Sequence, residues 1–132
     1  MRGIEFRGKI VGAEGFVYGK LLAPLASGNA YIAYDVNEVG SFAYISRSEK
    51  VDPETVGQYT ERQDIHNNKI FEKDIATCQF FDKKITGVIE FIEYMWAVND
   101  RKNQRLYQLN EVAYLEVIGN IHENPELLEG TE

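Results

Sequence analysis

Short runs rich in aromatic and β-branched residues, each ended by turn residues, constrain the fold of this chain more than any other feature. At the start, Ile4, Phe6 and Ile10 alternate with charged residues, which is the period of a half-buried strand. The runs AYIAYDV (30–36) and SFAYISR (41–47), with VNEVG between them, predict two antiparallel neighbours. Because no long amphipathic helix competes with these runs, the sequence predicts a mainly β protein, built as a small barrel or sandwich.

The second half of the chain repeats this pattern. Its strand signals are IFEKDIATCQFF, ITGVIEFIEYMWAV, RLYQL and YLEVIGNI. Two Asx-Pro-Glu sequences predict short helical turns, with Asp52 and Asn124 as N-caps. We therefore expect a hairpin-rich N-terminal half (1–50), a polar connection with one helical turn (51–70) and a C-terminal barrel with a short terminal helix (71–132). We expect these parts to form one compact unit.

Composition and charge narrow the classes of function. The chain has 132 residues, a net charge of −7 and one cysteine, which excludes an intrachain disulfide and a tetrahedral thiolate zinc site. From Leu106 onward there are six acidic residues and no Lys or Arg, so this part should repel nucleic acid. No apolar run reaches the ~20 residues that cross a bilayer, and no signal peptide is recognisable. We expect a soluble cytoplasmic protein with no membrane partner.

The segment DIHNNKIFEKDIATC (64–78) holds the densest set of reactive residue types. It contains Asp64, His66, Asp74 and Cys78. Strand parity groups Cys78 with Ala76 and Phe80, which predicts a buried cysteine and not a nucleophile. His66 precedes two asparagines, which are typical turn residues, and the chain's other histidine follows 56 positions later without ligand spacing. We expect a polar turn here, with no catalytic or metal site.

Three stretches carry a family resemblance: MRGIEFRGK, VDPETVGQYTERQDIHNNKIFEKDIA and VIGNIHENPELLEG, together with FVYGKLL. They are similar to the YopX family of small bacteriophage and prophage proteins, over nearly the whole chain and in the same order. The resemblance implies an SH3-like small β-barrel and a host-cytoplasmic phage protein. No biochemical activity is established for that family, so the resemblance gives no catalytic residues for this chain.

The chain departs from that family's pattern at two positions. The family usually has glycine after QYT and before the aspartate of the following strand, whereas this chain has Glu61 and Lys73. Glycine is common where the backbone has positive φ. The family pattern therefore does not fix the backbone conformation of these two turns. For Asp74, a general base by residue type, the resemblance instead implies a structural role, bonding backbone amides where the barrel's first strand begins.

No catalytic or cofactor motif is found, since the sequence has no P-loop and no GxGxxG. One binding surface is suggested by aromatic residues near cations: Tyr94, Trp96, Arg101, Lys102 and Arg105. Such a set can stack bases and contact phosphates, or anchor a protein partner, although strand aromatics usually face the core. We expect a non-enzymatic protein that needs no cofactor and that contacts itself or another phage or host protein. Single-strand nucleic-acid binding is the alternative, and an enzyme is a third.

Overall fold

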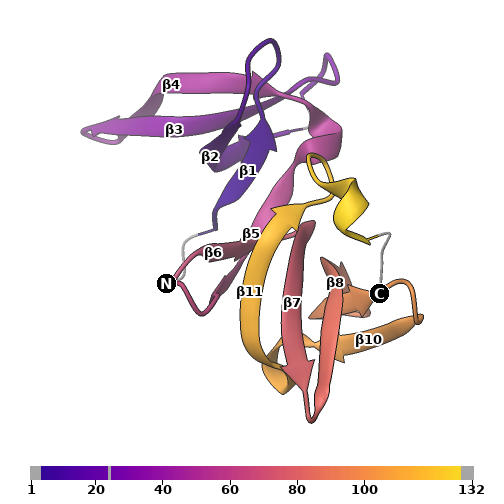
Figure 1. Cartoon of the computed structure of the whole chain (residues 1–132). Helices are drawn as coiled ribbons and strands as arrows, with labels where there is room; N and C mark the ends of the chain where they lie inside the picture. The colour runs from indigo at the N-terminus through magenta and orange to yellow at the C-terminus, as the bar shows by residue number, and fades with distance from the viewer. Residues whose placement is uncertain (1–3, 24, 129–132) are drawn as a thin grey trace. The chain divides into compact units, whose positions relative to one another are not determined.

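We describe residues 4–23 and 25–128 in a computed structural model, which is mainly antiparallel β structure (Figure 1). The chain divides into two compact units, Met1–Tyr59 and Thr60–Glu132. The expectation of one compact unit stays a prediction. In the described part of the chain, no helix is long and apolar enough to span a membrane.

The first unit is an antiparallel sheet with the strand order β4-β3-β2-β1 and the start of β5. Its strands are β1 (Phe6–Lys9), β2 (Phe16–Leu22), β3 (Ala30–Val39), β4 (Phe42–Val51) and β5 (Gly57–Gln63). The ends of β1 and β4 meet through a bridge between Ile10 and Val51. Ala30, Ile32 and Val51 form the centre of its small core.

Strands β3 and β4 form a long hairpin, seen in Figure 1 as two paired arrows. β2 pairs only with Tyr31, Ile32 and Ala33 of β3, whereas β3 and β4 stay paired as far as Val39 and Phe42. The sequence-based expectation that VNEVG merely connects two strands was therefore wrong. Its valines continue β3, because each meets an apolar partner on β4, and the turn lies at Gly40 and Ser41.

The DPE sequence after β4 forms a single 3-10 turn, Pro53–Thr55. The Asp52 carboxylate accepts the backbone N–H of Glu54 at 3.1 Å, the capping arrangement that this residue type favours at a helix start. The Thr55 hydroxyl accepts the N–H of Lys9 at 2.9 Å. The turn is thereby attached to β1.

The second unit begins within β5 and contains a second antiparallel sheet, ordered β10-β9-β8-β7-β11. The sheet is built from β7 (Asp74–Phe80), β8 (Lys83–Ile92), β9 (Met95–Asp100), β10 (Arg105–Gln108) and β11 (Ala113–Asn120), whereas β6 (Lys69–Phe71) of the same unit pairs with β5. The run ITGVIEFIEYMWAV is not one strand, because Glu93 and Tyr94 turn the chain between β8 and β9. Both residues have positive φ, which is typical of a two-residue hairpin turn.

The second sheet has two ends, β10 and β11, so the described strands do not form the closed barrel that we expected. Closure requires hydrogen bonding between the two end strands. Both end strands nevertheless contribute to one core, β10 through Tyr107 and β11 through Leu115. The sheet is therefore folded around a common interior without being closed by pairing.

The C-terminal turn predicted from NPELL is a 3-10 turn, Pro125–Leu128. The N-cap role expected for the Asn124 side chain stays a prediction. The oxygen of the Asn124 side chain accepts the N–H of Asn120 at 3.2 Å. Gly119 leaves room for this contact, since a Cβ there would lie 2.6 Å from the same oxygen.

Candidate interaction surface

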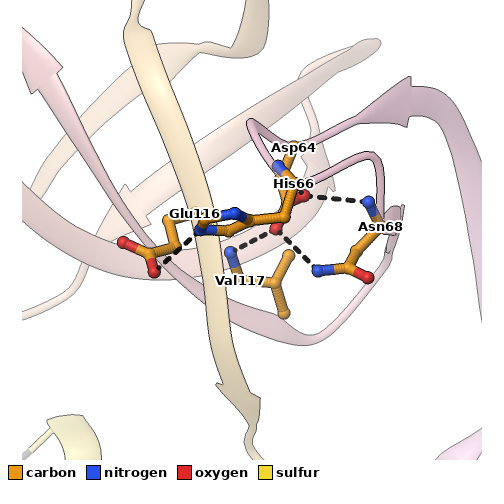
Figure 2. Close-up of polar contacts among 5 residues, drawn as sticks. All are labelled: Asp64, His66, Asn68, Glu116 and Val117. Atoms are coloured by element: carbon orange, nitrogen blue, oxygen red, sulfur yellow. Dashed lines mark hydrogen bonds and ion pairs between the residues drawn. The ribbon is translucent and has the colours of Figure 1, made fainter.

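The polar turn after β5 is organised by the carboxylate of Asp64, a buried side chain (Figure 2). One oxygen accepts the backbone N–H groups of His66 and Asn68, both at 2.9 Å. The other accepts the N–H of Val117 on β11 at 3.0 Å and the Asn68 amide at 3.4 Å. Asp64 therefore ties its own turn to a strand that is 53 residues away.

These contacts shift the acidity of Asp64. Burial by itself raises the pKa of the carboxyl, but the hydrogen bonds from Val117, Asn68 and His66 outweigh it, so the pKa lies below its ordinary value. The charged form is the one that the fold stabilises. This arrangement uses the carboxylate to close a turn.

His66 lies at the surface of this turn, as the sequence indicates. Its Nε2 is 3.3 Å from a carboxylate oxygen of Glu116 on β11, and both side chains are about half exposed (Figure 2). Asn67 has a φ of 65°, which confirms a left-handed turn residue beside it. In the described part of the chain, no group of three or more His, Cys, Asp or Glu residues is placed to hold a metal ion.

Cys78 is buried, with 3% of its surface exposed, which confirms the parity argument. Burial and the nearby charge of Asp100 raise the pKa of the thiol to about 11. Only the thiolate is nucleophilic, so the native cysteine is poorly suited to catalysis.

The alkylation rate of Cys78 tests this assignment. At pH 8 we expect iodoacetamide to modify the native chain about a hundredfold more slowly than the urea-unfolded chain, because native thiolate is scarce. Mass spectrometry over time measures both rates. Equal rates in the two states would contradict the buried assignment.

Asp74 has the structural position that the resemblance implies. It is the first residue of β7, it is buried, and its carboxylate accepts the N–H of Phe71 at 2.8 Å. This bond closes the tight turn between β6 and β7.

The five residues suggested as a binding surface lie in different parts of the second unit. Tyr94 is 96% exposed in the β8–β9 turn, while Trp96 packs on the core and contacts Phe91 with a centroid distance of 5.1 Å. Arg101 lies beyond the other end of β9, and six strand residues separate it from Tyr94 by roughly 20 Å.

The cations of that set also have protein contacts. The Arg101 guanidinium binds one Glu90 oxygen through two nitrogens, at 3.0 and 2.6 Å. Arg105 lies over the Tyr107 ring at 5.8 Å, and Lys102 is exposed in the turn. The structure does not bring the aromatic and cationic members together as one surface, and their role stays a prediction.

A larger exposed apolar surface lies on the β3–β4 hairpin, beyond the part that β2 covers. We call this part, Tyr34 to Arg47, the ribbon. Its exposed apolar side chains are Tyr34, Val36, Val39, Phe42, Tyr44 and Ile45. Phe42 alone is 76% exposed. Such a concentration on a two-stranded element is typical of a contact surface, because an isolated hairpin is only marginally stable in water.

A family model described as YopX protein matches residues 5–129 of the chain. The chain belongs to the YopX family. This confirms the resemblance seen in the sequence. A search of curated proteins gives no match.

Two solved structures are similar in fold to this chain. The crystal structure of protein EF1440 from Enterococcus faecalis has 20% identity and a TM-score of 0.61, covering 98% of this chain and all of that one. The crystal structure of protein yopX from Bacillus subtilis has 18% identity and a TM-score of 0.53, covering 97% of this chain and 98% of that one. At these identities the comparison supports the fold alone.

The two positions where the resemblance implies glycine have the positive φ that glycine favours. Glu61 has a φ of 71° and Lys73 a φ of 76°. For Lys73 the conformation is held from both sides. Its N–H donates to Ile89 at 2.7 Å, and its carbonyl accepts from Ile121 at 3.0 Å. The backbone pairing therefore imposes a conformation that the side chain disfavours.

Placing glycine at these positions should stabilise the chain. We expect Glu61→Gly and Lys73→Gly each to raise the free energy of unfolding by about 1 kcal/mol, because the left-handed penalty is removed. Urea unfolding measures the change. Lys84→Gly, at an exposed position on β8 without positive φ, is the control and should lower stability. A loss of stability in both test variants would contradict the explanation.

Proposed function

We propose that this chain is a non-enzymatic phage or prophage protein of the host cytoplasm that works through protein contacts, including contact with its own copies. The observation that carries the proposal is the ribbon, which presents apolar side chains on both of its faces. Val36 pairs with Ile45 on one face, and Val39 with Phe42 on the other. A ribbon that is apolar on both faces gains from being covered by another chain.

The reactive side chains support the non-enzymatic part of this proposal. Asp64 and Asp74 are engaged with backbone N–H groups, and Cys78 is buried. These three residues and His66 are the reactive residues of the segment 64–78, and a structural role for the three supports the proposal.

The relation of the second unit to SH3-type small barrels belongs to the same proposal. A core shared by β10 and β11, the two ends of the sheet order, supports it. Single-strand nucleic-acid binding through Trp96 and the Arg101–Arg105 loop stays a prediction. Unchanged mobility of labelled single-stranded DNA at low salt would exclude it.

A charge on the ribbon tests the proposed function. We expect Tyr44→Arg to weaken self-association by at least about tenfold, because a charge would have to lose its water where the partner covers the ribbon. The matched control is Phe81→Arg, which places the same charge at an exposed aromatic outside the ribbon. Light scattering over a concentration series reports the mass. An equal effect of both variants, or no effect of Tyr44→Arg, would contradict the proposal.

A further inference from the structure

One stretch of β4 lies at the edge of its sheet and has no strand of the described residues paired to its outer side. β4 is the last strand in its sheet order. Toward its end the outer side is occupied, because the Lys50 carbonyl accepts the N–H of Val11 at 2.9 Å. Toward its start it is limited by the turn at Gly40 and Ser41. In the described chain this leaves 42–48 with no strand on the outer side.

The backbone of this edge is oriented for pairing. Successive residues of a strand point their N–H and C=O groups to opposite sides. The backbone N–H and C=O groups of Lys50 point away from β3. The backbone groups of every second residue before it therefore do the same, at Ser48, Ser46, Tyr44 and Phe42. The β3–β4 register shifts near Asp35 but returns to its original value, so the alternation holds on both sides of the irregularity.

From Phe42 to Ser46 the edge lacks the features by which proteins usually prevent strand pairing. Proline, lysine and inward-pointing charges are the common protections. The sequence from Phe42 to Ser46 has none of these residues, and the first charge is Arg47.

We propose that two copies of this chain pair β4 with β4 in antiparallel orientation, with the twofold axis at Ile45. The proposal rests on the proposed function and specifies its partner and geometry. Ile45 is the middle residue of 42–48, so this register uses the whole free edge. It sets Phe42 opposite Ser48, Ala43 opposite Arg47 and Tyr44 opposite Ser46 of the partner.

The side chains fit this register. Val36 lies beside Ile45 in the ribbon, so the two copies form a row of four apolar side chains across the axis. Arg47 faces the partner's small Ala43, whose neighbour on β3 is Glu38. A guanidinium can extend over alanine toward that carboxylate, which gives two symmetric charge pairs.

Other registers fit less well. An axis at Arg47 would place two guanidinium groups directly opposite each other, which is destabilising. An axis at Ser46 would set Ile45 against a charged Arg47. The pairing at Ile45 also uses the same edge of both copies, so it closes as a dimer and does not extend into a fibre.

A cysteine at the axis tests the register. In an antiparallel pair the residues at a non-hydrogen-bonded axis have Cα atoms about 4.5 Å apart, which a disulfide can span. We therefore expect Ile45→Cys to form a cross-linked dimer rapidly under mild oxidation. The control is Ala43→Cys on the same strand and face, where the two cysteines would lie roughly 13 Å apart along the strands. Wild-type chain, with only the buried Cys78, gives the background.

The outcomes separate this inference from the proposed function. Cross-linking of Ile45→Cys at least about tenfold faster than that of Ala43→Cys supports the register. A dimeric mass with equal or slower cross-linking at Ile45 overturns the register and leaves self-association standing. A wild-type chain that stays monomeric overturns both.

Discussion

Asp64→Ala is expected to lower the free energy of unfolding by about 3 kcal/mol, because it removes the charged acceptor of several backbone N–H groups. Three such groups bind this carboxylate, from His66, Asn68 and Val117. Hydrogen bonds to a charged acceptor are stronger than neutral ones, so their loss should dominate over the small change in packing. Urea unfolding followed by circular dichroism measures the effect.

A control and a pH series make this result specific. Asp82→Ala removes an exposed carboxylate from the β7–β8 turn and should change stability by less than about 0.5 kcal/mol. The folded pKa of Asp64 lies below 3.8, so its contribution to stability is complete above that pH and is lost as the pH falls through the folded value. The difference between wild type and Asp64→Asn should therefore shrink in acid. A difference that grows in acid would contradict the assignment.

Gly87→Ala is expected to cost about 3 kcal/mol, because strands β8 and β9 leave no space for a side chain there. A Cβ at this position would lie 2.6 Å from the carbonyl oxygen of Asn99 and 2.8 Å from a methyl of Val98. The carbonyl belongs to the backbone of the neighbouring strand, so it cannot rotate away. The strands must separate or the core must shift.

Lys84→Ala on the same strand is the matched control, since it removes an exposed side chain and should change stability by less than about 0.5 kcal/mol. Thermal unfolding of the two variants provides the comparison. Similar melting temperatures for both would show that the sheet adapts more easily than the close approach indicates.

The sequence predicts local features of this fold well. Alternation locates the strands, and parity buries Cys78. The Asx-Pro-Glu signal places the turn at Pro53. Each of these depends on residues close together in the chain, where period and capping chemistry act directly.

Features that depend on distant partners are not visible in the sequence. The bond from Val117 to Asp64 joins residues that are far apart in the chain. An aspartate two residues before His66 signals a turn, but not its strand partner. Glu61 and Lys73 show the same limit, because tertiary pairing holds a conformation that their residue types disfavour.

The candidate surface was missed for a related reason. VNEVG resembles a turn because of its polar residues and glycine, yet its valines continue β3 opposite Ile45 and Phe42. The exposed ribbon results from this extension. Tyr94 and Arg101, conversely, are close in sequence but separated by the length of β9.

The central claim is that this protein acts by association, beginning with its own copies. Sedimentation equilibrium of the wild-type chain from about 1 to about 300 µM tests it most directly, because dimerisation depends on concentration. We expect the mass to rise from that of the monomer to 30.2 kDa, twice the 15.1 kDa of one chain. A mass that stays at 15.1 kDa over the whole range would contradict the account.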